Sequence, residues 1–186
     1  NTAPSDACAQ EDGMIVNITA QGYGGLQVII TWDTPHDPNQ VDHSGTDLDL
    51  HLMHPNGQRW NESPWDCYFA NANPSWGSTG VGNDPTLDID DVNGTGPESI
   101  SYTEPEPTTD RPYQVGIYHY GGSIAQDLGA SRVTASVYVN GELAETLTRE
   151  IEIGEFLVPF EITWSEQGEG TVHVVDHRYD DFPSAP

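Results

Sequence analysis

The sequence predicts an all-β protein, an antiparallel β-sandwich or jelly roll with one long irregular loop region. Short runs of alternating apolar and polar residues recur along the chain, bounded by glycine, proline or asparagine. No helical period persists over about ten residues. Asn140-Gly141 stands between two such runs and favours a tight type I′ hairpin turn. Short strands and turns at this spacing are typical of two packed antiparallel sheets.

The first part of the chain combines strands with one long connection. Residues 1–12 are predicted to be a polar N-terminal arm. Strands are predicted at 14–19, 26–32 and 46–53. Residues 55–97 form a long region rich in Asn, Pro, Gly and Trp. Loops of that length are uncommon in compact domains unless they are functional or held in place by a ligand or crosslink.

The strand signals become dense after residue 98. Further strands are predicted at 113–120, 133–139, 142–153, 160–164 and 172–174. We therefore expect a single sandwich domain over 13–175, with a loosely held tail at 176–186. A chain of 186 residues is long enough for one such core.

The composition is strongly acidic. Thirty Asp and Glu residues face five arginines and no lysine, which gives a net charge of −25. Nucleic acid and anionic lipid need cationic partners, so we expect no nucleic-acid binding. The lack of a long apolar run predicts no membrane insertion. Such a surface favours the binding of divalent cations, or else it reflects adaptation to salt. From the composition as a whole we expect a secreted or cell-surface protein.

The two cysteines, Cys8 and Cys67, are far apart in the sequence. In an extracellular protein such a pair predicts one disulfide closing a long loop, whereas in a cytosolic protein it would be two thiols. We favour the disulfide because the rest of the composition is extracellular in character.

The run Thr46 to Met53 alternates acid and leucine as TDLDLHLM. Side chains alternate between the two faces of a strand. The leucines should therefore enter the core, while Asp47, Asp49 and His51 share the opposite face. Two carboxylates held in line repel each other unless solvent, salt or a cation intervenes.

A second group of acids follows about forty residues later. It consists of Asp84, Asp88, Asp90, Asp91 and Glu98. Calcium takes six to eight oxygen ligands with flexible geometry, and the spacing here does not fit an EF-hand. We predict a Ca²⁺ site formed by these acids together with Asp47 and Asp49. The alternative is a solvated acidic face.

Histidines offer an alternative metal site. His51, His54 and His119 would suit copper or zinc if they met in space. A lone histidine on a strand is more often a packing or surface residue.

Three tryptophans, Trp60, Trp65 and Trp76, lie close together in the long region. If exposed, they would form a platform for a glycan or an aromatic peptide anchor. If buried, they would pack the loop down around Cys67, and we favour this second interpretation.

The motifs of common enzymes are missing. The sequence has no nucleophile elbow, no zinc-protease motif and no glycine-rich phosphate loop. A hydrolase is therefore the least supported alternative, and we expect a non-enzymatic protein.

Five strings resemble a group of bacterial secreted and surface domains. They are TDLDLHLMHPNG (46–57), DCYFANANPSWG (66–77), NDPTLDIDD (83–91), GTGPE (94–98) and YQVGIYHY (113–120). The set resembles the uncharacterised YfaP-like domains and is similar to calcium-dependent peptide-binding modules of bacterial adhesins. The resemblance implies a β-sandwich with the acids at 47, 49, 88, 90, 91 and 98 as ligands. The expected protein is an extracellular, calcium-stabilised binding or structural module whose partner is a glycan, a peptide, a surface protein or another copy of itself.

Overall fold

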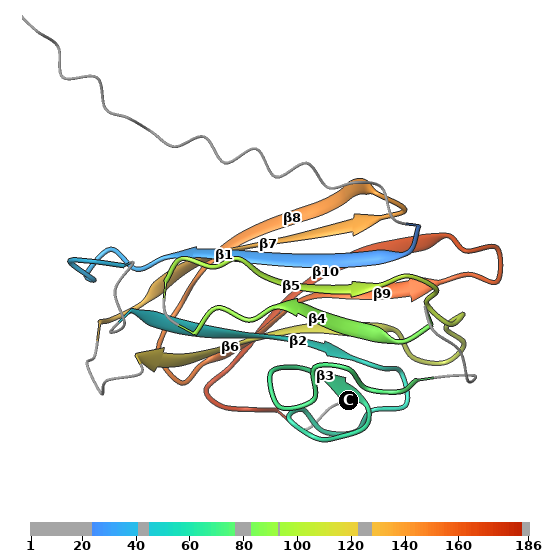
Figure 1. Ribbon diagram of the computed structural model, residues 1–186, viewed down its shortest axis with the longest axis horizontal. Coiled ribbons are helices and arrows are strands. Elements are labelled where there is room, and N and C mark those ends of the chain that lie inside the picture. The colour runs from blue at the N-terminus through green and yellow to red at the C-terminus, as the bar shows by residue number, and fades with distance from the viewer. Residues whose placement is uncertain (1–23, 41–44, 77–82, 93, 123–127, 184–186) are drawn as a thin grey trace, which may run out of the picture.

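The computed structural model describes residues 24–40, 45–76, 83–92, 94–122 and 128–183, and these contain strands and no helix. The strands form two antiparallel five-stranded sheets packed face to face (Figure 1). This confirms the predicted all-β sandwich. None of the described segments is a helix with the length and apolar character needed to cross a membrane.

Each sheet combines strands from distant parts of the chain. The first sheet has the spatial order β4 (Pro85–Ile89), β5 (Glu98–Tyr102), β1 (Leu26–Asp33), β7 (Ser131–Val139) and β8 (Glu142–Ile151). The second has the order β10 (Gly170–Tyr179), β9 (Phe156–Trp164), β6 (Tyr113–Gly122), β2 (Thr46–Met53) and β3 (Asp66–Cys67). Glu98 and Asp47 therefore belong to opposite sheets.

The core lies between the sheets. It is built from the side chains that point inward at every second position of the strands. Val28 and Ile30 of β1 and Leu48, Leu50 and Leu52 of β2 are fully buried. Burying a side chain of this size contributes about 1.5–3 kcal/mol through the hydrophobic effect. The acid–leucine alternation of β2 thus places its leucines in the core, as predicted.

The hairpin predicted at Asn140-Gly141 connects β7 to β8. Both residues have positive φ, 51° and 81°, as a type I′ turn requires. The predicted arm 1–12 and the predicted strand 14–19 lie outside the described residues.

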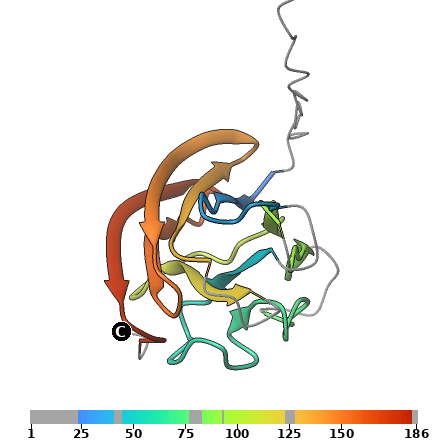
Figure 2. The ribbon, with the colours of Figure 1, turned by 90° about the vertical axis from the view of Figure 1, so that its left-hand side faces the viewer.

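The far edges of the two sheets meet along one side of the sandwich. There β8 and β10 curve beside each other (Figure 2). Arg149 on β8 donates from Nε and Nη2 to the carboxylate of Asp176 on β10, at 2.9 and 2.8 Å. This bidentate pair joins the two edges.

The long connection predicted at 55–97 contains two short strands. Its β3 pairs with β2, placing Cys67 opposite Leu52, and its β4 pairs with β5, placing Leu87 opposite Ile100. The acidic segment expected to be a flexible loop is therefore partly an edge strand, because Leu87 reaches the core. At the other end, β10 continues to Tyr179, beyond residue 175 where the sequence placed the end of the domain.

Candidate cation site

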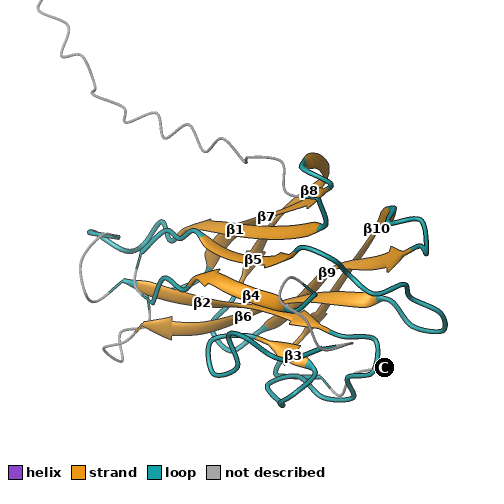
Figure 3. Cartoon of the chain, turned by 45° about the vertical axis from the view of Figure 1, so that its right-hand side comes forward, coloured by secondary structure: helices purple, strands orange, loops and turns teal. Residues whose placement is uncertain are grey.

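The site lies at the edge of β2, where the two sheets come together. The short β3 pairs only with Leu52 and Met53, so it does not cover the first half of that edge. Here β5 of the opposite sheet packs against β2. Figure 3 shows this side of the sandwich, with β4 at the edge of the first sheet drawn over β2. The N–H of Leu50 donates to Oε2 of Glu98 at 2.7 Å, and the N–H of Gly94 donates to the Thr46 carbonyl at 3.2 Å.

Three carboxylates converge at this edge. Asp47 and Asp49 come from β2 and Glu98 from the first residue of β5, and we call these three residues the carboxylate triad. Each offers an oxygen atom, and the three atoms lie within 4.8 Å of one another. The residues are only 9%, 7% and 1% exposed. Carboxylates this close and this buried repel one another strongly when ionised.

Burial raises the pKa of all three acids. The pKa of Asp47 rises to about 7, first through desolvation and then through repulsion by Asp49, Asp90 and Asp91. The pKa of Asp49 rises to about 6 through desolvation, although nearby His51 opposes the rise.

Of the three acids, Glu98 has the pKa that is raised most. Desolvation raises the pKa of Glu98 to about 10, although the hydrogen bond from Leu50 lowers it. Without a cation, Glu98 therefore keeps its proton at neutral pH. No arginine forms a salt bridge with the triad in the described part of the chain.

Two oxygens of the triad are buried and accept no hydrogen bond from the described residues. They are Oδ1 of Asp47 and Oε1 of Glu98. Leaving a buried polar atom without a hydrogen bond costs about 1–3 kcal/mol, which favours a bound partner for these two oxygens. A donor set made only of oxygen suits Ca²⁺ or Mg²⁺ and fits zinc or copper poorly.

Two further predicted acids border the triad. Asp90 and Asp91 are close enough to raise the pKa of Asp47 by repulsion. Oδ2 of Asp91 also accepts the N–H of Gly96 at 3.0 Å, which fixes the turn leading into Glu98. The segment between β4 and β5 thus presents two more carboxylates beside the triad.

The remaining predicted acids have other partners. Asp84 accepts the backbone N–H of Trp76 at 2.6 Å, and Asp88 accepts a long bond of 3.4 Å from the Ser99 hydroxyl. Neither belongs to the carboxylate triad. The structure therefore joins Asp47, Asp49 and Glu98 and sets Asp84 and Asp88 apart from them.

Trp32 holds the backbone on both sides of the carboxylate triad. The sequence did not indicate this role, because Trp32 lies in an ordinary alternating strand. Its indole Nε1 donates to the Thr46 carbonyl at 3.2 Å, and its backbone N–H donates to the Thr95 carbonyl at 2.9 Å. A Cβ at Gly96 would lie 2.9 Å from the Trp32 ring, and Gly96 has φ of +81°. Only glycine allows this turn to pass so close to the ring.

The three candidate histidines lie in separate surroundings. Nδ1 of His51 lies 2.8 Å from Oδ2 of Asp66, and both residues are fully buried. Burial lowers the pKa of His54 to about 4, so this imidazole is neutral. His119 hydrogen-bonds the Ile151 carbonyl at 3.1 Å. Within the described residues, the histidines do not gather into a metal-ligating group.

The tryptophans do not form an exposed binding platform. Trp60 is 5% exposed, Trp76 is fully buried, and Trp65 is partly buried. The Trp76 indole donates to the Pro64 carbonyl at 2.6 Å, and the Trp65 ring stacks on His54. These contacts pack the long connection against the sandwich, as the favoured interpretation predicted, and the alternative of an exposed ligand-binding platform formed by the three tryptophans does not hold.

The predicted disulfide is not seen at Cys67, the one of its two cysteines that the structure describes. Cys67 is a free thiol, fully buried opposite Leu52, and its Sγ lies 3.7 Å from the Ala72 carbonyl. Burial raises the pKa of this thiol and makes it unreactive. Cys8, the other half of the predicted bond, lies outside the described residues.

Comparison with known proteins supports the fold alone. No family model matches the chain. A solved structure described as a protein of unknown function, SAV2460, is similar with a TM-score of 0.53 and 17% sequence identity. The match covers 88% of this chain and 94% of the other. The sandwich therefore has a counterpart among solved structures, and that likeness carries no functional assignment.

Proposed function

We propose that this protein is an extracellular, calcium-stabilised β-sandwich module that binds a partner at the cell surface and has no enzymatic activity. The observation that carries the proposal is the pair of buried, unpartnered oxygens on Asp47 and Glu98 within a cluster of three carboxylates. A divalent cation would pair these atoms and offset the repulsion between the acids. Asp90, Asp91 and solvent would supply further oxygens toward the six to eight that calcium takes.

The cation would act as a structural link. Asp47 and Asp49 belong to one sheet and Glu98 to the other, so a shared ion would join the two sheets at the edge of β2. It would also hold the segment between β4 and β5 in place. Calcium at about 10⁻⁴–10⁻³ M stabilises many extracellular modules in this manner, which is the basis for proposing a secreted or cell-surface location.

Terbium luminescence tests the site directly, because Tb³⁺ substitutes for Ca²⁺ and the Trp32 indole that bonds Thr46 lies beside the site as a sensitiser. We expect excitation of tryptophan to produce Tb³⁺ emission that Ca²⁺ displaces and that Zn²⁺ and Cu²⁺ do not displace at equal concentration. Asp47→Asn should abolish the signal.

The matched control is Asp88→Asn, which removes the same charge from a predicted ligand that lies outside the triad. Its emission should equal that of the unmodified protein. The proposal is wrong if no calcium-displaceable emission appears, or if Asp47→Asn and Asp88→Asn behave alike.

A further inference from the structure

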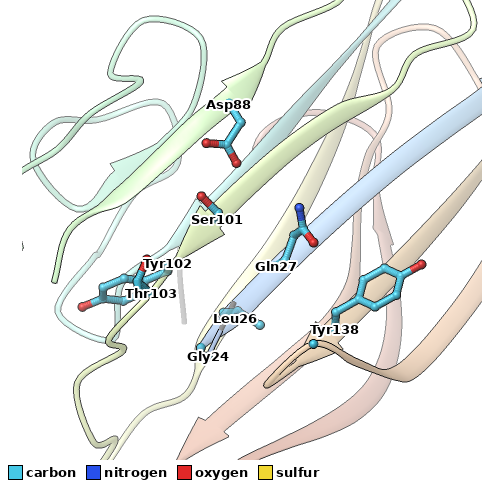
Figure 4. A pocket seen from close by; sticks show the side chains of 10 residues that line it. Gly24, Leu26, Gln27, Asp88, Ser101, Tyr102, Thr103 and Tyr138 are labelled. Atoms are coloured by element: carbon cyan, nitrogen blue, oxygen red, sulfur yellow. The ribbon is translucent and has the colours of Figure 1, made fainter. Parts of the chain in front are cut away.

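A second feature lies on the outer face of the first sheet, away from the core. It is a groove with a cavity volume of about 280 Å³ that crosses β4, β5, β1 and β7 (Figure 4). The strand register pairs Ser101 with Gln27 and Gln27 with Tyr138, so these three side chains form one row across the sheet. On β4 the register partner of Ser101 is Thr86, and Asp88 lines the groove two residues further on, at the bulge of that strand.

The polar groups of the row are free to bind a ligand. The side chains of Gln27, Ser101 and Tyr138 make no hydrogen bond to any residue that the structure describes, and Asp88 accepts only the 3.4 Å bond from Ser99. An amide, a hydroxyl, a phenol and a carboxylate therefore line one groove. Figure 4 shows the side chains of Asp88, Ser101 and Gln27 in succession and the broad face of the Tyr138 ring beside them.

One end of the groove is lined by backbone. Among the described residues, Gly24, Gly25 and Gly141 contribute only backbone to that end. The volume is just below the range of about 300–1,000 Å³ that holds drug-sized ligands. The groove thus has room for about one ring of a ligand.

We propose that this groove binds a neutral glycan. A sugar ring has an apolar face that packs on an aromatic ring, and vicinal hydroxyls that pair with amide, hydroxyl and carboxylate groups. No arginine lines the described part of the groove, and with a net charge of −25 the protein repels acidic sugars. The partner proposed above is then a neutral surface polysaccharide, although the groove does not depend on the cation site.

The probes for the test are four neutral oligosaccharides: maltohexaose, cellohexaose, mannohexaose and chitohexaose. Binding to the full chain is measured by calorimetry in calcium-containing buffer. We expect at least one of them to bind. Tyr138→Ala should weaken that binding about tenfold through loss of stacking, whereas Tyr138→Phe should retain most of it. Gln27→Ala should weaken it to a similar extent.

The matched control is Tyr179→Ala, which removes an exposed tyrosine of β10 on the other sheet and should leave binding unchanged. Melting curves establish that each variant is folded. If Tyr138→Ala does not fold, Gln27→Ala is the variant that tests the groove. The proposal is overturned if none of the four glycans binds, or if binding persists unchanged in both Tyr138→Ala and Gln27→Ala. Tighter binding of an arginine-rich peptide in the same groove would also overturn it. Terbium binding tests the cation site separately, so the failure of one proposal is distinguishable from the failure of the other.

Discussion

Replacing Asp49 with asparagine should stabilise the cation-free protein at neutral pH and weaken the calcium-bound protein. The side chain is 7% exposed and forms no salt bridge with an arginine that the structure describes, so its ionised form is disfavoured in the fold. Asparagine has nearly the same shape and carries no charge. The change therefore separates the cost of burying a carboxylate from the benefit of binding a cation.

The expected magnitude follows from the pKa. The pKa of Asp49 rises from 3.8 to about 6 on folding. Each unit is worth about 1.4 kcal/mol, so ionisation destabilises the cation-free fold by up to ~3 kcal/mol at pH 7.5. The Asp49→Asn variant should recover part of this amount. Calcium at about 100 times its Kd would stabilise the unmodified protein by ~2.7 kcal/mol, and the variant should lose most of that gain.

The contribution of Asp49 to stability depends on pH. Because the folded pKa lies above the unfolded value, the contribution of Asp49 to stability is complete below pH 3.8 and is lost as the pH rises through about 6. Asp47 acts in the same direction between 3.8 and about 7. In chelator, these two groups should make the unmodified protein less stable as the pH rises from about 4 to 7. The advantage of Asp49→Asn should therefore be absent at about pH 4.

Urea denaturation followed by tryptophan fluorescence measures all of these quantities. Each protein is unfolded at about pH 4 and about pH 7.5, and at the higher pH both in chelator and in excess calcium. Asp88→Asn is the control and should change stability by less than about 0.5 kcal/mol in every condition. If Asp49→Asn destabilises the protein equally in chelator and in calcium at neutral pH, the carboxylate is already satisfied by the fold and the reasoning is refuted.

Three further outcomes follow from the packing and the exposed charges. Trp76→Ala should reduce the free energy of unfolding by about 3–5 kcal/mol in urea titrations, because it empties a fully buried site and removes an indole hydrogen bond; a loss below about 1 kcal/mol would contradict the packing role. In a Cys8→Ser background, Cys67 should resist a thiol reagent until urea unfolds the protein, and rapid labelling of the native state would disprove its burial. Arg149→Met should lower stability in urea titrations only slightly, and by less in high salt, because its pair with Asp176 is partly exposed; a salt-independent loss would point to packing instead.

The local features of this fold were predictable from the sequence. A period of two in β2 separates Leu48 and Leu50 from Asp47 and Asp49, whatever the strand packs against. Asn140-Gly141 likewise defines its own turn, because both residues tolerate positive φ. These features were predictable because they depend on residues that are neighbours in the chain.

The membership of the carboxylate triad was decided by tertiary structure. The sequence offered several acids after residue 83, and only the pairing of β5 with β1, together with the packing of one sheet on the other, brings Glu98 to the N–H of Leu50. The folded chain also places the Asp84 carboxylate at the backbone N–H of Trp76 and buries Cys67 as a free thiol. Side-chain alternation is a property of a single strand, whereas a contact between strands of different sheets depends on the register and packing of the whole sandwich. The sequence alone therefore determined the all-β class and the acidic face of β2, and the assembled sheets decided which carboxylates share a site.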